Sequence, residues 1–193
     1  MTINVPNLLT AAGLAAGAGS IAASQQGHLA LAATLLVLAL ILDRFDGVAA
    51  RWLGLTSDFG ARLDSLADLV SFGVAPVVLS NAIVPNDTLV VITGIAWTVA
   101  SGWRLARFSE DGMIDSRFGR AFCGVPAPGA AAWLLLSAAL LPSEWIAWGL
   151  GLTLVAGAML MVSRIPYPRN GPVLGATVVA LSVTLVVFWG AGS

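Results

Sequence analysis

Residues 43–68 read DRFDGVAARWLGLTSDFGARLDSLAD and lie between apolar runs long enough to cross a membrane; four of their five aspartates, Asp43, Asp46, Asp64 and Asp68, are spaced in helical steps. A carboxylate at the centre of a bilayer costs roughly 2.5–3.5 kcal/mol on translocon-insertion scales, and neighbouring carboxylates also repel one another. A divalent cation, or a pair of them, is the most economical reason for the chain to keep all four. The stretch therefore predicts a metal site inside a membrane protein.

The composition of the whole chain supports a membrane location. The chain has 193 residues, of which 58% are hydrophobic and 10% charged, with a mean hydropathy of +0.91. Soluble domains contain about 25% charged residues, so this chain lies outside that class. We expect one all-α integral membrane domain over residues 1–193, a polytopic helix bundle with no room for a separate soluble domain. The single cysteine, Cys123, excludes an intramolecular disulfide and a thiolate metal site.

The apolar runs predict six core transmembrane helices and one extra helix at the C-terminus. They lie near 7–24, 28–52, 61–84, 88–108, 126–142, 144–163 and 172–190. Small residues such as Gly13-x-x-x-Gly17 favour close packing of the first helix against a neighbour. Five tryptophans are expected to anchor the protein at the membrane interfaces, namely Trp97, Trp133, Trp145, Trp148 and Trp189.

The charges indicate the orientation of these helices. The chain has no lysine, and with these spans its nine arginines all fall at one membrane face: Arg44, Arg51, Arg62, Arg104, Arg107, Arg117, Arg120, Arg164 and Arg169. Loops rich in Lys and Arg stay in the cytoplasm, so this face is predicted to be cytoplasmic, with the N-terminus inside. The aspartates then lie at the cytoplasmic side, where water-soluble substrates are available.

Helical spacing predicts how the aspartates meet. Asp43 and Asp46 are one turn apart, while Gly60, Asp64 and Asp68 follow an i, i+4, i+8 stripe on the next helix. A turn around residues 54–59 would bring the two stripes face to face. Oxygen ligands of this kind suit Mg²⁺, Mn²⁺ or Ca²⁺, and two such ions would form a clamp for displacement at phosphorus.

The residues between the aspartates favour phosphoryl chemistry over two alternatives. Gly47, Ala50 and Gly60 would leave room for a substrate against the backbone, and Arg51 offers a positive charge for a phosphate. An internal Asp–Arg salt bridge would hold helices together, and a cation or proton-coupled transporter would also use intramembrane aspartates. Neither alternative requires the small residues or the arginine at these offsets.

The complete string from Asp43 to Asp68 resembles the signature of the CDP-alcohol phosphatidyltransferases, DxxDGxxARx₈GxxxDxxxD, without departure. The resemblance implies two divalent cations, Mg²⁺ or Mn²⁺, held by Asp43, Asp46, Asp64 and Asp68. It also implies that Asp68 is the base that deprotonates the acceptor hydroxyl. The CDP group would be bound at Gly47, Ala50, Arg51 and Gly60, together with Asp46. Membership of this family further implies a homodimer in a prokaryotic cell membrane.

Flanking segments resemble the serine-using branch of the family. These are LDSLADLVSFGVAP at 63–76, RLARF at 104–108, FCGVPAPGAA at 122–131 and PNLLT at 6–10. They imply transfer of a phosphatidyl group from CDP-diacylglycerol to L-serine, giving phosphatidylserine and CMP. Arg104 and Arg107 could bind the serine carboxylate, or could simply follow the positive-inside rule. Glycerol phosphate, inositol phosphate and an archaeal-type lipid donor remain alternatives with the same chemistry.

Overall fold

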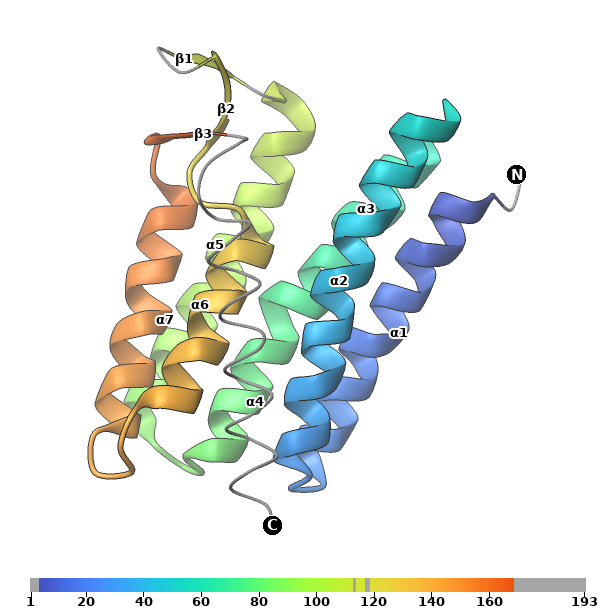
Figure 1. Cartoon of the computed structure of the whole chain (residues 1–193). Helices are drawn as coiled ribbons and strands as arrows, with labels where there is room; N and C mark the ends of the chain where they lie inside the picture. The colour runs from blue at the N-terminus through green and yellow to red at the C-terminus, as the bar shows by residue number, and fades with distance from the viewer. Residues whose placement is uncertain (1–3, 113, 117–118, 169–193) are drawn as a thin grey trace.

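The computed structural model describes residues 4–112, 114–116 and 119–168 and is dominated by helices (Figure 1). A small sheet is the other regular element. The helices are α1 (Val5–Gln25), α2 (Leu29–Leu53), α3 (Asp58–Asp68), the π-helix η1 (Leu69–Val74), α4 (Ala75–Ile83), α5 (Thr88–Asp111), α6 (Ala127–Leu140) and α7 (Ile146–Val162). The strands are β1 (Ile114–Ser116), β2 (Gly119–Cys123) and β3 (Pro166–Pro168).

The predicted helix bundle is confirmed in its class. Since α3, η1 and α4 follow one another without a break, the described residues form six helical rods that match the six predicted core segments. Three of these rods are long and apolar enough to cross a membrane: Val5–Gln25, Asp58–Ile83 and Thr88–Asp111. Helices α6 and α7 are apolar but shorter, and α2 carries charged residues in its second half. The predicted helix at 172–190 lies outside the described residues.

The turn between α2 and α3 is encoded locally. Helix α2 ends at Gly54, whose left-handed φ of 65° suits glycine. Helix α3 begins after Ser57, whose Oγ accepts a hydrogen bond from the Gly60 amide at 3.1 Å. These two caps leave four residues, 54–57, for the reversal, so the two aspartate-bearing helices run antiparallel, as the sequence predicted.

Small residues allow the helices to pack closely around the site. Helix α1 packs along α2 and also contacts α3, η1 and α4. At Gly17, an added β-carbon would overlap the Ser71 side chain of η1, whereas at Gly13 it would lie at an ordinary 3.6 Å from Leu42 Cβ. Ser71 Oγ donates to the Gly13 carbonyl at 3.3 Å. The predicted small-residue contact therefore joins α1 to the π-helix.

The sheet was not predicted from the sequence. Strand β2 pairs antiparallel with both β1 and β3, with Ile114 opposite Ala121 and Ala121 opposite Pro168. It therefore ties the connection between α5 and α6 to the segment after α7. The sheet, the start of α1 and the turn between α2 and α3 lie at the same end of the bundle (Figure 1). This is the end to which the arginines were assigned.

One predicted interface tryptophan is instead part of the core. Trp97 of α5 is fully buried, while Trp133, Trp145 and Trp148 are exposed by 55%, 64% and 69%. The anchor prediction is therefore wrong for Trp97, and Trp189 lies outside the described residues. Hydropathy cannot place a single tryptophan, because the side of the helix that carries it is set by packing against neighbouring helices.

The contrast between Gly17 and Gly13 predicts different outcomes for the same substitution. Gly17→Ala is expected to lower the unfolding free energy by about 2 kcal/mol, because the methyl group overlaps Ser71 in a packed interface. Gly13→Ala is expected to be neutral or to stabilise by roughly 0.5 kcal/mol, because alanine favours a helix interior. Denaturant unfolding of the detergent-solubilised protein measures both. Equal effects at the two positions would contradict the packing seen here.

Candidate metal and nucleotide site

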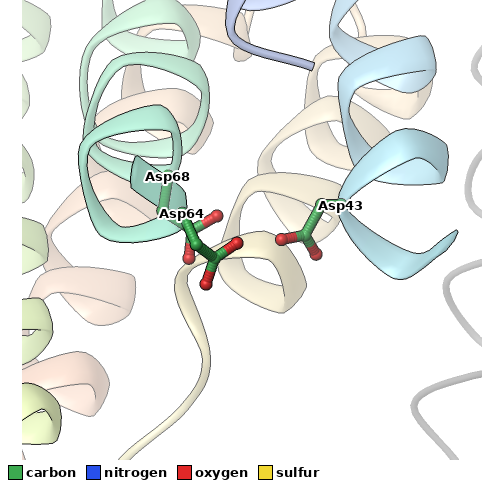
Figure 2. Close-up of side chains that lie close together, drawn as sticks. All are labelled: Asp43, Asp64 and Asp68. Atoms are coloured by element: carbon green, nitrogen blue, oxygen red, sulfur yellow. The ribbon is translucent and has the colours of Figure 1, made fainter. Parts of the chain in front are cut away.

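Three carboxylates meet between α2 and α3 (Figure 2). Asp43 projects from α2 toward Asp64 and Asp68, which come from successive turns of α3. Carboxylate oxygens of the three residues all lie within 4.8 Å of one another. Asp68 is 9% exposed and the other two are half-buried. Two carboxylates of α3 and one of the antiparallel helix α2 thus converge, as their helical spacing predicted.

The three carboxylates border a small pocket near the polar end of the bundle. The pocket is lined by residues from four elements: Thr10, Gly13, Ala39, Asp43, Asp46, Asp64, Ala67, Asp68, Ser71 and Phe72. Apart from the aspartates, the residues that line the pocket are small, hydroxyl-bearing or apolar. Like charges gathered in such a setting are stable only with a compensating positive charge.

The donor set fits a divalent cation. All the acidic ligands offer oxygen, which Mg²⁺, Mn²⁺ and Ca²⁺ prefer. Ligand oxygens about 2.1–2.5 Å from such an ion are separated by roughly 3–5 Å from one another. The spread of at most 4.8 Å among the oxygens of Asp43, Asp64 and Asp68 agrees with that range.

Asp46 is oriented differently from the other three aspartates. It is buried at 5% exposure, and its Oδ2 lies 2.6 Å from the Thr10 hydroxyl of α1, which donates to it. Asp46 lines the same pocket but is not among the three clustered carboxylates. The spacing of the aspartates did not predict Thr10 as a neighbour of the site. The resemblance of the PNLLT stretch at 6–10 to the family was the sequence feature that pointed to it.

The small residues of the signature lie at the polar ends of α2 and α3. A β-carbon added at Gly47 would lie 3.3 Å from Nη1 of Arg51, and one at Gly60 would lie 3.0 Å from Oδ1 of Asn7. Arg51 itself is exposed, and Ala50 is half-buried. Glycine at both positions thus leaves room for the side chains of Arg51 and Asn7.

Arg104 and Arg107 are one turn apart on α5 but have different surroundings. Arg104 is buried at 5% exposure, and within the described part of the chain its Nε has no hydrogen-bond partner. Its guanidinium lies 5.9 Å from the Phe108 ring centroid, and its charge acts on Asp43, Asp64 and Asp68. A buried cation with a free donor beside an acidic pocket is suited to a ligand anion.

Arg107 instead forms a set of hydrogen bonds with main-chain carbonyls. Its Nη1 donates to Val162 at 2.8 Å, and its Nη2 lies 2.9–3.2 Å from the carbonyl oxygens of Cys123, Met161 and Ser163. These carbonyls end α7 and β2, so the guanidinium caps the helix and joins it to the sheet. The two arginines were predicted as a pair, but Arg107 is bound to main-chain carbonyls whereas the Arg104 Nε has no partner among the described residues.

Comparison with known proteins identifies the family that the chain resembles. The family model for CDP-alcohol phosphatidyltransferases matches residues 3–188. A CDP-diacylglycerol–serine O-phosphatidyltransferase of Methanocaldococcus jannaschii is 37% identical over 155 residues, covering 80% of this chain and 72% of the relative. The enzyme of that name from Mycobacterium leprae is 35% identical, covering 86% of this chain and 58% of the relative. An archaetidylserine synthase of Methanothermobacter thermautotrophicus is 34% identical, covering 86% and 70%.

The hydrogen bond from Thr10 to Asp46 predicts an effect on cation binding. Thr10→Val keeps the shape of the side chain and removes the hydroxyl that holds Asp46 Oδ2, so Mn²⁺ affinity is expected to fall roughly tenfold. Isothermal titration calorimetry on the purified protein measures this. Thr93→Val is the matched control, because the Thr93 hydroxyl donates to the Leu89 carbonyl of its own helix α5. Unchanged affinity in Thr10→Val would show that the hydroxyl does not orient Asp46 for the cation.

Proposed function

The chain belongs to the CDP-alcohol phosphatidyltransferase family, and we propose that it transfers a phosphatidyl group from CDP-diacylglycerol to L-serine. The products are phosphatidylserine and CMP. The convergence of Asp43, Asp64 and Asp68 from two helices carries the proposal on the structural side. On the comparative side, all three relatives described above are named for a serine-derived product or a serine acceptor.

The four aspartates of the signature hold two divalent cations, Mg²⁺ or Mn²⁺, in this proposal. Cations held there would neutralise the pyrophosphate of the CDP-lipid and would stabilise negative charge on the departing CMP. The contribution of the chain is to hold Asp43, Asp64 and Asp68 in place from two antiparallel helices, with Asp46 oriented by Thr10.

Asp68 serves as the general base as well as a ligand. It lies on the buried side of α3, next to the pocket lining formed by Ala67, Ser71 and Phe72. The serine hydroxyl oxygen attacks the lipid-side phosphorus, and its proton passes to the Asp68 carboxylate. The bond between that phosphorus and the bridging oxygen breaks, so this oxygen leaves with CMP.

The two halves of the donor occupy different surroundings. The nucleotide binds at Gly47, Ala50, Arg51 and Gly60, at the polar end of the bundle where glycine keeps the backbone open. The acyl chains lie along exposed apolar side chains of the membrane-spanning helices, such as Ile92, Ile95 and Val99 of α5. This division suits a substrate that is charged at one end and apolar at the other.

Arg104 is the better candidate for the carboxylate of serine. Its Nε is a buried donor without a partner among the described residues, and the acidic pocket lies within reach of its charge. Arg107 supports the site indirectly, because its guanidinium is already engaged by carbonyls of α7 and β2.

The protein acts as a homodimer in the cell membrane, with this end of the bundle facing the cytoplasm.

The acceptor is tested by measuring CMP release from the purified protein with CDP-diacylglycerol and a panel of alcohols. We expect rapid release with L-serine and at least about tenfold slower release with glycerol phosphate or inositol phosphate, because a site shaped for one polar acceptor rejects others strongly. A CDP-archaeol donor in the same assay tests lipid preference. Release with glycerol phosphate and not with serine would refute the serine assignment. Substrate transport without CMP formation would refute the reaction class.

The base role of Asp68 predicts a separation of catalysis from binding. Asp68→Asn keeps the size of the side chain and is expected to lower turnover at saturating Mn²⁺ by at least about 10²-fold, the usual contribution of a general base. Binding of the CDP-lipid, measured by calorimetry, is expected to change only a few-fold. Asp58→Asn, at an exposed position of the same helix, is the control and keeps full turnover. Retained turnover in Asp68→Asn would remove Asp68 from the base role.

A further inference from the structure

Helix 58–83 is interrupted by a π-helical turn directly after the last aspartate of the site. Asp68 is the residue immediately before η1, and the Ala75 amide at its end donates to the carbonyl of Val70, five residues back. A π-turn of this kind is rare and inserts the equivalent of one extra residue into a helix. The turn lies directly beside the carboxylates, so the contacts that stabilise it bear on the position of their helix.

Pro76 removes one helical hydrogen-bond donor at the end of this turn. In a regular α-helix the Phe72 carbonyl would accept a hydrogen bond from residue 76, but proline has no amide hydrogen and its ring crowds that carbonyl. Phe72 and Pro76 are both buried in the bundle, so water is not at hand to replace the lost donor. An unsatisfied carbonyl inside a membrane protein is costly, and such groups are usually satisfied by a neighbouring helix.

Trp97 of α5 provides the missing donor. Its indole Nε1 donates to the Phe72 carbonyl at 2.9 Å, and the next residue, Thr98, donates through Oγ1 to the Gly73 carbonyl at 3.0 Å. The indole is fully buried and fits closely against α7, since a β-carbon at Gly157 would overlap it. Two adjacent residues of α5, Trp97 and Thr98, therefore bond to two successive carbonyls of η1.

The π-turn determines which way the aspartates of α3 face. Each residue of an α-helix adds about 100° of rotation, so loss of the inserted residue would turn Asp64 and Asp68 by about that angle relative to α4. Helix α4 is held by contacts with α1, α2 and α5. The carboxylates would then point away from Asp43, which now lies with them inside 4.8 Å.

We propose that Trp97 is a positioning residue of the site: its indole N–H replaces the amide that Pro76 lacks, stabilises the π-turn and so keeps Asp64 and Asp68 directed toward Asp43. The effect on catalysis rests on the function proposed above. The effect on the turn and on cation binding does not depend on the acceptor.

The test compares Trp97→Phe, Pro76→Ala and the double variant with the native protein. Trp97→Phe removes the N–H and keeps most of the ring, and Pro76→Ala restores an amide that can bond to the same carbonyl. Trp103→Phe, at an exposed position of α5, is the matched control. Three readouts are measured: hydrogen exchange of residues 69–84, the Mn²⁺ concentration giving half of the maximal shift in Tm, and CMP release.

Trp97→Phe is expected to speed exchange in 69–84, to raise the Mn²⁺ requirement roughly tenfold and to slow CMP release by a similar factor, as loss of a buried partner does. Adding Pro76→Ala is expected to recover most of each change, because both substitutions act on the Phe72 carbonyl. Trp103→Phe is expected to change none of the readouts. Should Trp97→Phe not fold, Thr98→Val weakens the same turn through Gly73 and is expected to show smaller shifts in the same direction.

Additive effects of Trp97→Phe and Pro76→Ala, or unchanged Mn²⁺ requirement in Trp97→Phe, would overturn the positioning role and leave only a packing role for the ring. The Mn²⁺ and exchange readouts need no turnover. If the native protein released no CMP with serine, the proposed function would fail while these two readouts still decided the role of Trp97.

Discussion

Mutual repulsion among closely spaced carboxylates inside the bundle is the constraint on which the rest of this structure depends. Asp43, Asp64 and Asp68 bring their oxygens within 4.8 Å of one another between helices of a membrane protein. Without a compensating cation these groups would destabilise the bundle, because both burial and like charge oppose ionisation. The surrounding structure therefore has to hold the three side chains together at the one place where a cation can join them.

Backbone contacts between helices supply that restraint. Helix α1 approaches the site closely through Gly13 and Gly17, and its Thr10 hydroxyl orients Asp46. On the other side, Trp97 of α5 bonds to the π-turn below Asp68. Ser71, Trp97 and Thr98 each donate to a main-chain carbonyl of a neighbouring helix, as is usual where carbonyls in a membrane protein need a partner. The helices around the site are thus linked to one another by hydrogen bonds.

The helical segments, the reversal between α2 and α3 and the meeting of three of the aspartates could be predicted because each follows from local sequence pattern. Hydrophobic length predicts a span, and an i, i+4 spacing predicts a shared helix face. The small sheet, the burial of Trp97 and the capping role of Arg107 could not be predicted in this way. Each depends on which segments distant in sequence become neighbours, and the amino-acid pattern around each residue carries little information about its partner.

The amino-acid sequence by itself determined the membrane class, the order of the helices and the set of carboxylates, since these depend on composition and on spacing within one helix. Only the tertiary structure decided which partners these residues contact. It separated Asp46 from the three clustered aspartates through Thr10, and Arg104 from Arg107 through the carbonyls at the end of α7. It also brought the Trp97 indole to the Phe72 carbonyl, which lacks a donor from Pro76. The physical reason is that a hydrogen bond forms between groups that are close in space, and these partners lie far apart along the chain.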